Sequence, residues 1–170
     1  NGTSETEKIE AALAALGAIL VQPERHKLKE LFLGANYALS CTGVYDKDAL
    51  WKCLEQQEQM TSLRLNYIAY ELEPPHCKAL GNALVKMQNL TSVELRANYM
   101  HDDGVTALAE SLGELHKLTE LRLGGNKIGD RGAITLAAQL AKLNSLKYFG
   151  IGFNEIGADG AAALAKSLKQ

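Results

Sequence analysis

The sequence has few of the features that mark nucleic-acid-binding or membrane proteins. Its 170 residues include 18 basic and 20 acidic side chains, which give a formal net charge of −2. The two signs are interleaved, which argues against a nucleic-acid footprint or strong attraction to an acidic membrane surface. No apolar run approaches the length of a transmembrane helix. We therefore expect neither a nucleic acid nor a membrane as a partner.

Cysteine is scarce as well, with Cys41, Cys53 and Cys77 as its three members. Their odd number and their spacings fit neither a zinc motif nor a disulfide framework. Reduced cysteines favour a cytosolic or nuclear setting, and we expect the cytoplasm. Two N-x-T tripeptides, at Asn1 and Asn89, are common by chance and leave glycosylation an open question.

Motifs for catalysis and cofactor binding are missing. The histidines are scattered and have no zinc-type spacing with each other or with cysteine. The segment 124–129 reads GGNKIG but lacks phosphate-loop spacing, and the third glycine after Gly150 and Gly152 is misplaced for a dinucleotide fingerprint. No G-x-S-x-G elbow is present. We expect no enzyme activity, no metal and no cofactor.

What the sequence does contain is a repeated phrase, L-x-x-L-x-L-x-x-N. Its five occurrences begin at Leu28, Met60, Leu90, Leu118 and Leu146, so they lie 32, 30, 28 and 28 residues apart. The alternation at the end of each phrase predicts a short strand with one buried face. A period in this range, pairing a strand with a helix, indicates a leucine-rich solenoid.

An apolar stripe with helical spacing follows each of the last four phrases. The predicted stripes are Cys77-Leu80-Leu84-Met87, Val105-Leu108-Leu112-Leu115, Ala133-Leu136-Leu140-Leu143 and Ala161-Leu164-Leu168. Small alanines, Ala109, Ala137 and Ala165, widen the stripes. These patterns predict one buried helix face in each repeat.

Polar and small residues recur at fixed repeat positions. We expect carboxylates at the helix starts to accept backbone N–H groups; the candidates are Asp102 or Asp103, Asp130 and Asp159. Glycines at one shared position indicate a close approach to the neighbouring coil; they are Gly104, Gly132 and Gly160. The phrase asparagines are expected to satisfy backbone groups at a sharp bend rather than to bind a ligand; they are Asn36, Asn98, Asn126 and Asn154.

The stretch Leu118–Ser145, LTELRLGGNKIGDRGAITLAAQLAKLNS, resembles the 28-residue repeat of ribonuclease-inhibitor-like leucine-rich-repeat proteins. That family includes the ribonuclease inhibitor, NOD-like receptor recognition regions, the Ran GTPase activator and tropomodulin. The resemblance implies an α/β fold, a right-handed βα solenoid of about five repeats. Since strands pack more closely than helices, the parallel sheet should be concave and the helices convex.

We expect a single leucine-rich-repeat domain over residues 1–170. Residues 1–27 are predicted to form an N-terminal capping helix or half-repeat, and residues 28–170 to form five repeats. Two repeats depart from the pattern. The first has about four extra residues around Tyr37–Asp46, and the second has Ile68 in place of asparagine, followed by Pro74 and Pro75. We expect bulges or kinks in these two strand-to-helix loops.

The C-terminal end lacks an evident cap. The next phrase would be due near position 174, whereas the sequence stops at Gln170. Because solenoid ends need a polar outer face, two alternatives remain open. Either the sequence is part of a longer chain, or Tyr148, Phe149 and Phe153 help to close the end.

Positions between the buried strand leucines point to the concave face. One such row contains Phe32, Arg64, Glu94, Arg122 and Gly150. Its charges predict lateral salt bridges, a polar contact surface, or both. Tyrosine and arginine are enriched at interface hot spots, although Tyr99 could instead cover its loop and Phe153 could shield the chain end. The candidate partner-binding residues are Phe32, Arg64, Tyr67, Glu94, Arg96, Tyr99, Arg122, Tyr148 and Phe153.

Three functional hypotheses follow. The leading one is a non-enzymatic module that binds a protein or peptide through the concave face. The second, implied by the resemblance to the Ran GTPase activator, is a GTPase regulator that uses Arg131 or Asn126. The third, implied by the resemblance to NOD-like receptors, is a ligand-sensing or autoinhibitory segment of a larger receptor.

Overall fold

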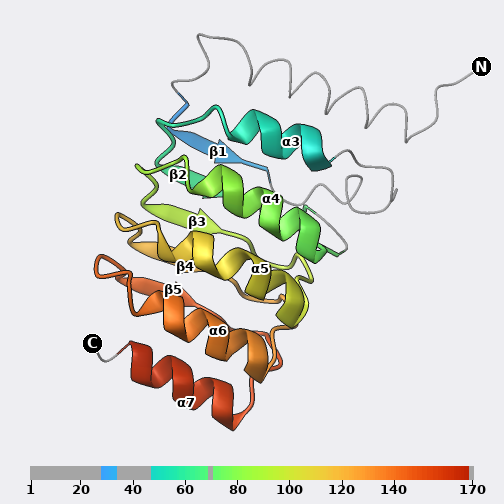
Figure 1. Ribbon diagram of the computed structural model, residues 1–170, viewed down its shortest axis with the longest axis vertical. Coiled ribbons are helices and arrows are strands. Elements are labelled where there is room, and N and C mark those ends of the chain that lie inside the picture. The colour runs from blue at the N-terminus through green and yellow to red at the C-terminus, as the bar shows by residue number, and fades with distance from the viewer. Residues whose placement is uncertain (1–27, 34–46, 69–70, 169–170) are drawn as a thin grey trace, which may run out of the picture.

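The computed structural model describes residues 28–33, 47–68 and 71–168 (Figure 1). Over these residues, five strands alternate with five helices. In chain order they are β1 (Glu30–Phe32), α3 (Lys47–Leu54), β2 (Ser62–Arg64), α4 (Pro74–Leu84), β3 (Ser92–Glu94), α5 (His101–Gly113), β4 (Glu120–Arg122), α6 (Asp130–Leu140), β5 (Tyr148–Gly150) and α7 (Ala158–Ser167). The predicted N-terminal cap over 1–27 and the extra residues around Tyr37–Asp46 lie outside the described residues.

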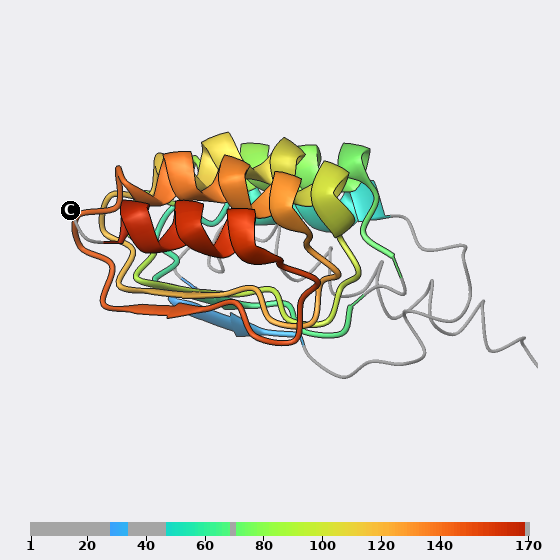
Figure 2. The ribbon, with the colours of Figure 1, turned by 90° about the horizontal axis from the view of Figure 1, so that it is seen from below.

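The strands form one parallel sheet in the order β1-β2-β3-β4-β5. The register aligns the middle leucine of each phrase with that of the next, as in Leu63 with Val93 and Val93 with Leu121. Figure 2 shows the helices in a second layer on one side of this sheet. The predicted α/β leucine-rich-repeat solenoid is therefore confirmed, and each coil contacts the coils before and after it.

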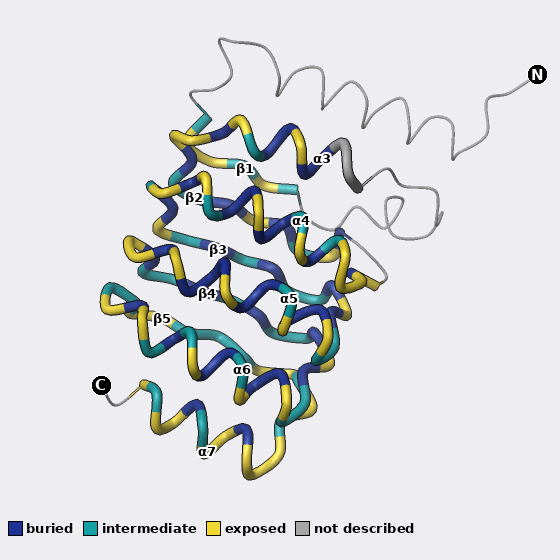
Figure 3. Tube along the Cα trace, in the orientation of Figure 1, coloured by how far each residue is buried: buried dark blue, intermediate teal, exposed yellow. Residues whose placement is uncertain are grey.

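The core lies between the sheet and the helices (Figure 3). The second, third and fourth phrases bury all their leucine-type positions, and the stripes predicted for α4, α5 and α6 are buried along their whole length. Cys77, in the first of these stripes, is a buried free thiol whose S–H donates to the Leu72 carbonyl at 3.2 Å. A period of apolar residues is sufficient to specify this packing, because the hydrophobic effect is not directional.

The last coil departs from the prediction. Of its stripe only Leu164 is buried, whereas Ala161 and Ala165 are exposed and Leu168 is 52% exposed. The reason is geometric, because among the described elements α7 packs mainly on α6, and no described coil covers its other side. Phe153 is 98% exposed, so the expectation that it helps to close this end is wrong.

The asparagine ladder is confirmed as a structural device. Asn98 donates from Nδ2 to the Leu65 carbonyl at 2.7 Å, and its Oδ1 accepts the Ile68 N–H at 2.9 Å. Asn126 repeats the pattern one coil later, donating to the Leu95 carbonyl at 2.8 Å and accepting the Asn98 N–H at 2.9 Å. Both side chains are fully buried. Each asparagine thus satisfies backbone groups that the bend leaves unpaired.

The aspartates at the helix starts bond to a different helix from the one predicted. Asp102, in α5, accepts the N–H groups of Gly129 and Gly132 at 2.7 and 3.0 Å, and both donors belong to the start of α6. Asp130 accepts the equivalent groups at the start of α7, both at 2.8 Å. Each carboxylate therefore caps the helix of the next coil and ties successive coils together.

The predicted close approach at the repeated glycines is confirmed. A Cβ atom at Gly132 would lie 2.6 Å from Asp102 Oδ1 and 2.7 Å from Val105 Cγ1. At Gly160 it would lie 2.6 Å from Asp130 Oδ1. The absence of a side chain allows the helix start to reach the carboxylate that caps it.

The second repeat shows how prolines fit into the solenoid. Pro74 and Pro75 begin α4, where they are tolerated because a first-turn proline lacks only an N–H that has no intrahelical partner. Ile68, in the ladder position, is buried, and its backbone N–H donates to Asn98 Oδ1. Residues 69 and 70 of this loop lie outside the described residues.

Candidate partner-binding surface

The exposed face of the sheet carries a lattice of alternating charges. The register aligns Arg64 with Glu94 and Glu94 with Arg122. Glu94 Oε1 lies 3.3 Å from Arg64 Nε and 3.8 Å from Arg122 Nε, and Arg122 also bonds to Glu120. The lateral salt bridges expected from the sequence are therefore present. Because such exposed pairs contribute about 0–1 kcal/mol each, the lattice adds little to folding.

Glu120 is held in its ionised form. Its partial burial tends to raise the pKa of the carboxyl group, but hydrogen bonds from Arg122 and Ser92 oppose this, together with the positive charges of Arg122 and Arg64. The net result is a pKa below the ordinary glutamate value. The hydrogen bond to Glu120 likewise raises the pKa of Arg122. This part of the sheet is thus a fixed array of charges near neutral pH.

Exposed aromatic residues gather on the strand side. In the described part of the chain, the large apolar residues that stay exposed are Phe32, Tyr67, Tyr99, Ile134, Tyr148, Phe153 and Leu168. All five aromatics among them belong to strands or to the turns that follow strands. Two are held by cations: the Arg122 guanidinium lies 4.2 Å from the Tyr148 ring centre, and Lys127 Nζ lies 4.6 Å from that of Tyr99.

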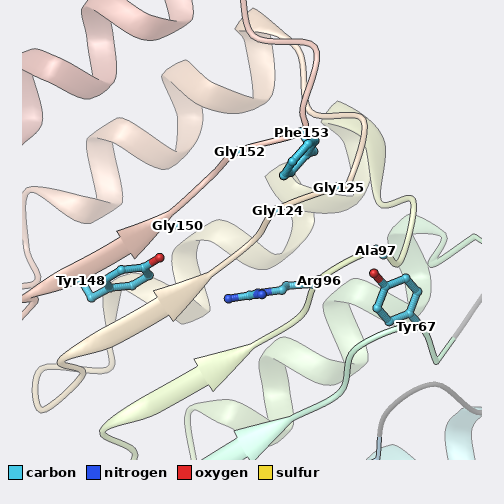
Figure 4. A pocket seen from close by; sticks show the side chains of 9 residues that line it. All are labelled: Tyr67, Arg96, Ala97, Gly124, Gly125, Tyr148, Gly150, Gly152 and Phe153. Atoms are coloured by element: carbon cyan, nitrogen blue, oxygen red, sulfur yellow. The ribbon is translucent and has the colours of Figure 1, made fainter.

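A pocket of about 370 Å³ lies on this face at the β4–β5 end (Figure 4). Nine residues line it: Tyr67, Arg96, Ala97, Gly124, Gly125, Tyr148, Gly150, Gly152 and Phe153. We call it the glycine-floored pocket. It brings together four of the predicted contact residues, Tyr67, Arg96, Tyr148 and Phe153. Phe32, Arg64, Glu94, Tyr99 and Arg122 do not line it.

The glycines were not predicted as site residues. Gly124 and Gly152 occupy the repeat position of Arg96, and Gly150 is aligned with Arg122. A Cβ atom at Gly152 would meet nothing within 4 Å, so the space above it is open. The sequence did contain a signal, because glycine replaces arginine at these repeat positions. A search for charged, polar or aromatic site residues does not select glycines.

Arg96 differs from the other arginines of this face. Its side chain is half-buried and lines the pocket, and in the described ranges its guanidinium makes no ion pair. Its backbone N–H donates to Asn66 Oδ1 at 2.8 Å, which fixes the start of the side chain. In Figure 4 the guanidinium extends between Tyr67 and Tyr148. The pocket therefore contains a positive charge that no acidic neighbour in the described ranges balances.

The turn beside the pocket has a left-handed backbone. One repeat position has φ 56° at Tyr67, 54° at Ala97, 72° at Gly125 and 59° at Phe153. Glycine adopts this conformation readily, whereas other residues lose about 1–2 kcal/mol there. Because this conformation recurs in four successive repeats, it belongs to the turn of the solenoid, and at Tyr67 and Phe153 it presents an exposed aromatic ring.

Two residues considered for GTPase regulation have structural partners. Asn126 is fully buried in the ladder, so its side chain is not accessible to a GTPase. Arg131 Nη2 lies 2.5 Å from Asp103 Oδ1, across two successive coils.

The described residues contain no helix long and apolar enough to cross a membrane, and no group of three acidic, histidine or cysteine side chains arranged for a metal ion.

Comparison with known proteins agrees with the fold. The leucine-rich-repeat family model matches residues 86–109, 114–137 and 142–165. No curated protein matches the chain.

Two solved structures are similar over nearly the whole chain. The tropomodulin C-terminal domain of Caenorhabditis elegans has a TM-score of 0.69 at 12% identity, covering 92% of this chain and 91% of that one. A structure described as Leiomodin-1 Actin-Binding Site 2 has a TM-score of 0.62 at 16% identity, covering 99% and 92%. At these identities the likeness concerns the fold. The repeat phrase, the ladder and the parallel sheet, together with the three matched repeats, show that the chain has the leucine-rich-repeat fold and is similar to ribonuclease-inhibitor-like repeat proteins.

Proposed function

We propose that the protein is a non-enzymatic interaction module whose exposed sheet face binds a protein or a peptide. The observation that supports this best is the distribution of exposed aromatics. Of the seven exposed large apolar residues in the described part of the chain, the five aromatic ones lie on the strand side, and the other two, Ile134 and Leu168, belong to the helix side. Exposed aromatic rings leave apolar area in contact with water, and aromatic residues are enriched where partners bind.

The face is also rigid, which favours binding. The charges of Arg64, Glu94 and Arg122 hold one another in place, and the cation–π contact with Arg122 fixes the ring of Tyr148. Side chains that are already ordered lose less conformational entropy when a partner docks. The buried core and the asparagine ladder keep the strands beneath them in register.

Actin is the first partner to test, since one of the similar structures is described as an actin-binding site. We also propose a cytoplasmic location, where the buried thiols of Cys53 and Cys77 would stay reduced. Co-sedimentation with actin filaments is a direct assay. In parallel, affinity capture with crosslinking from the cells that make the protein would identify partners without a prior choice.

The decisive measurement compares two faces of the same protein. A sheet-face variant, Tyr67→Ser with Tyr148→Ser, should weaken binding of the identified partner by about tenfold or more, since aromatic anchors carry much of the binding energy. A helix-side variant, Ile134→Ser with Lys142→Ala, should bind normally. Circular dichroism would verify that both remain folded. Equal loss from the two variants, or loss only from the helix side, would contradict the proposal.

A further inference from the structure

The glycine-floored pocket has features that define a more specific ligand. We propose that it accepts a peptide segment of the partner in which an aspartate or glutamate stands next to an apolar side chain. The carboxylate would pair with Arg96, and the apolar group would rest on the glycine floor between Tyr148 and Phe153. This inference rests on the proposed function, because it assigns a partner chemistry to the same face.

The floor provides room for a side chain or a backbone close to the sheet. Gly124 and Gly152 follow β4 and β5 and lack side chains, and an added Cβ at Gly152 would meet no atom within 4 Å apart from its chain neighbours. At Gly150 an added Cβ would instead lie 3.2 Å from the Tyr148 ring, so the open part of the floor is at Gly152. A pocket of about 370 Å³ is small for a ligand site and suits one or two side chains of a peptide. The glycine floor sets the depth to which a partner reaches.

The walls are aromatic. Figure 4 shows Tyr148 and Phe153 on the β5 side and Tyr67 on the opposite side. Tyr148 is oriented by Arg122, whose Nη1 donates to the tyrosine Oη at 3.4 Å. Phe153 is 98% exposed on a left-handed backbone, so its ring is available to cover an apolar group in the pocket. Burying that ring against a partner would be favourable by the hydrophobic effect.

The charge of the pocket specifies the polar half of the ligand. Arg64 and Arg122 already face Glu94, and Arg122 faces Glu120 as well, which leaves Arg96 as the pocket's unbalanced charge among the described residues. A guanidinium binds a carboxylate through two parallel hydrogen bonds. One arginine matches the single charge of a carboxylate, whereas a phosphate would bring a second negative charge into a pocket in whose lining Arg96 supplies one positive charge. We therefore favour an acidic side chain over a phosphorylated one.

The test uses displayed linear peptides of random sequence as the probe. Selection on the folded protein should enrich peptides with an acidic residue beside an aliphatic or aromatic one. In calorimetric titration, changing that acid to its amide should weaken binding about tenfold, as expected for loss of a charged pair. The Arg96→Gln variant should bind the acidic and amide peptides equally. Arg131→Gln, which removes an arginine outside the pocket, serves as the matched control and should keep the preference for the acid.

A second variant tests the floor without altering charge. Gly152 has no left-handed backbone angle and open space above it, so Gly152→Leu should fold normally while filling the pocket. We expect at least a tenfold loss of peptide affinity. Gly152→Ala, which fills less of the pocket, should lose less affinity, and its thermal unfolding provides the folding reference.

The outcomes separate this inference from the broader proposal. Enriched peptides without an acid, tighter calorimetric binding of a selected peptide whose acid is replaced by phosphoserine, or affinity unchanged by Gly152→Leu would each overturn the pocket assignment. If a partner still loses binding through Tyr67→Ser with Tyr148→Ser but not through Arg96→Gln or Gly152→Leu, the sheet face binds and the pocket does not. If no partner depends on the sheet face, the proposed function itself fails.

Discussion

The fourth coil, built from β4 and α6, and the fifth, built from β5 and α7, carry almost the same sequence pattern in different surroundings. Leu121 and Ala133 of the fourth coil are completely buried, whereas the aligned Phe149 is half-buried and Ala161 is exposed. The difference arises because the fourth coil is covered on both sides and the fifth on one. An apolar residue in a solenoid thus acquires its stabilising role from the next coil as much as from its own.

The largest effect should come from the core position that distinguishes the two coils. Leu121→Ala removes a fully buried side chain at the centre of the sheet and should reduce the free energy of unfolding by about 3 kcal/mol. Phe149→Ala removes more atoms from a half-buried site and should cost about half as much, since water already reaches it. Urea unfolding followed by circular dichroism measures both. A larger loss at Phe149 would show that the last coil is as well packed as the fourth.

The asparagine ladder provides the second test. Asn126→Ala leaves the Asn98 N–H and the Leu95 carbonyl without their partners in a fully buried site, and we expect a loss of about 2 kcal/mol. Asn154 makes equivalent bonds to Asn126 and Leu123 in a half-buried site. Water can replace part of those bonds, so Asn154→Ala should cost about 1 kcal/mol. Equal losses from the two variants would refute the inference that burial by a following coil makes the bonds of Asn126 more important for stability than those of Asn154.

A smaller effect is expected at the repeated glycines. An added Cβ at Gly132 would lie 2.7 Å from Val105 Cγ1 and crowd the carboxylate of Asp102. The overpacking outweighs the gain in helix propensity, so Gly132→Ala should destabilise by about 1 kcal/mol. Gly160→Ala creates the same crowding, but α7 can move outward, and we expect little change. Thermal unfolding of both proteins checks this, and a shift at Gly160 equal to that at Gly132 would contradict it.

These differences define what the sequence could and could not predict. The phrase and its stripes predicted the strands, the helices and the parallel order, because the spacing of apolar residues alone determines which face is buried. The exposure of Ala161 was missed, because a single repeat carries no information on whether a neighbour covers it. Asp102 was expected to accept an N–H group at the start of its own helix. Only the packing of two coils shows that its carboxylate accepts from the start of the next helix, α6.

The candidate site was predictable in part. Register followed from aligning the leucines of successive phrases, so the row of Arg64, Glu94 and Arg122 could be placed from the sequence. The glycine-floored pocket could not, because it depends on missing side chains at Gly124 and Gly152 and on how far the flanking rings reach. A surface hollow is a property of several coils together, and the repeat pattern constrains only the buried side.

The smallest predicted effect concerns Glu120, which belongs to the covered fourth coil but points to the exposed face. Its pKa is lowered in the folded protein, so its contribution to stability is complete above the ordinary glutamate value of about 4.3 and is lost as the pH falls through the lowered pKa. Because the side chain is partly exposed, we expect Glu120→Gln to cost at most about 0.5 kcal/mol at neutral pH and nothing in strong acid.

Urea unfolding at a series of pH values, with Glu110→Gln on the exposed side of α5 as the control, measures the pH-dependent part of this effect. The difference in unfolding free energy between wild type and Glu120→Gln should disappear as the pH falls through the lowered pKa of Glu120. A gap that widens in acid would reverse the sign assigned to the Arg122–Glu120 pair. A small value here, beside about 3 kcal/mol for Leu121, would mean that even in a fully covered coil the exposed face adds little to stability and is free to serve recognition.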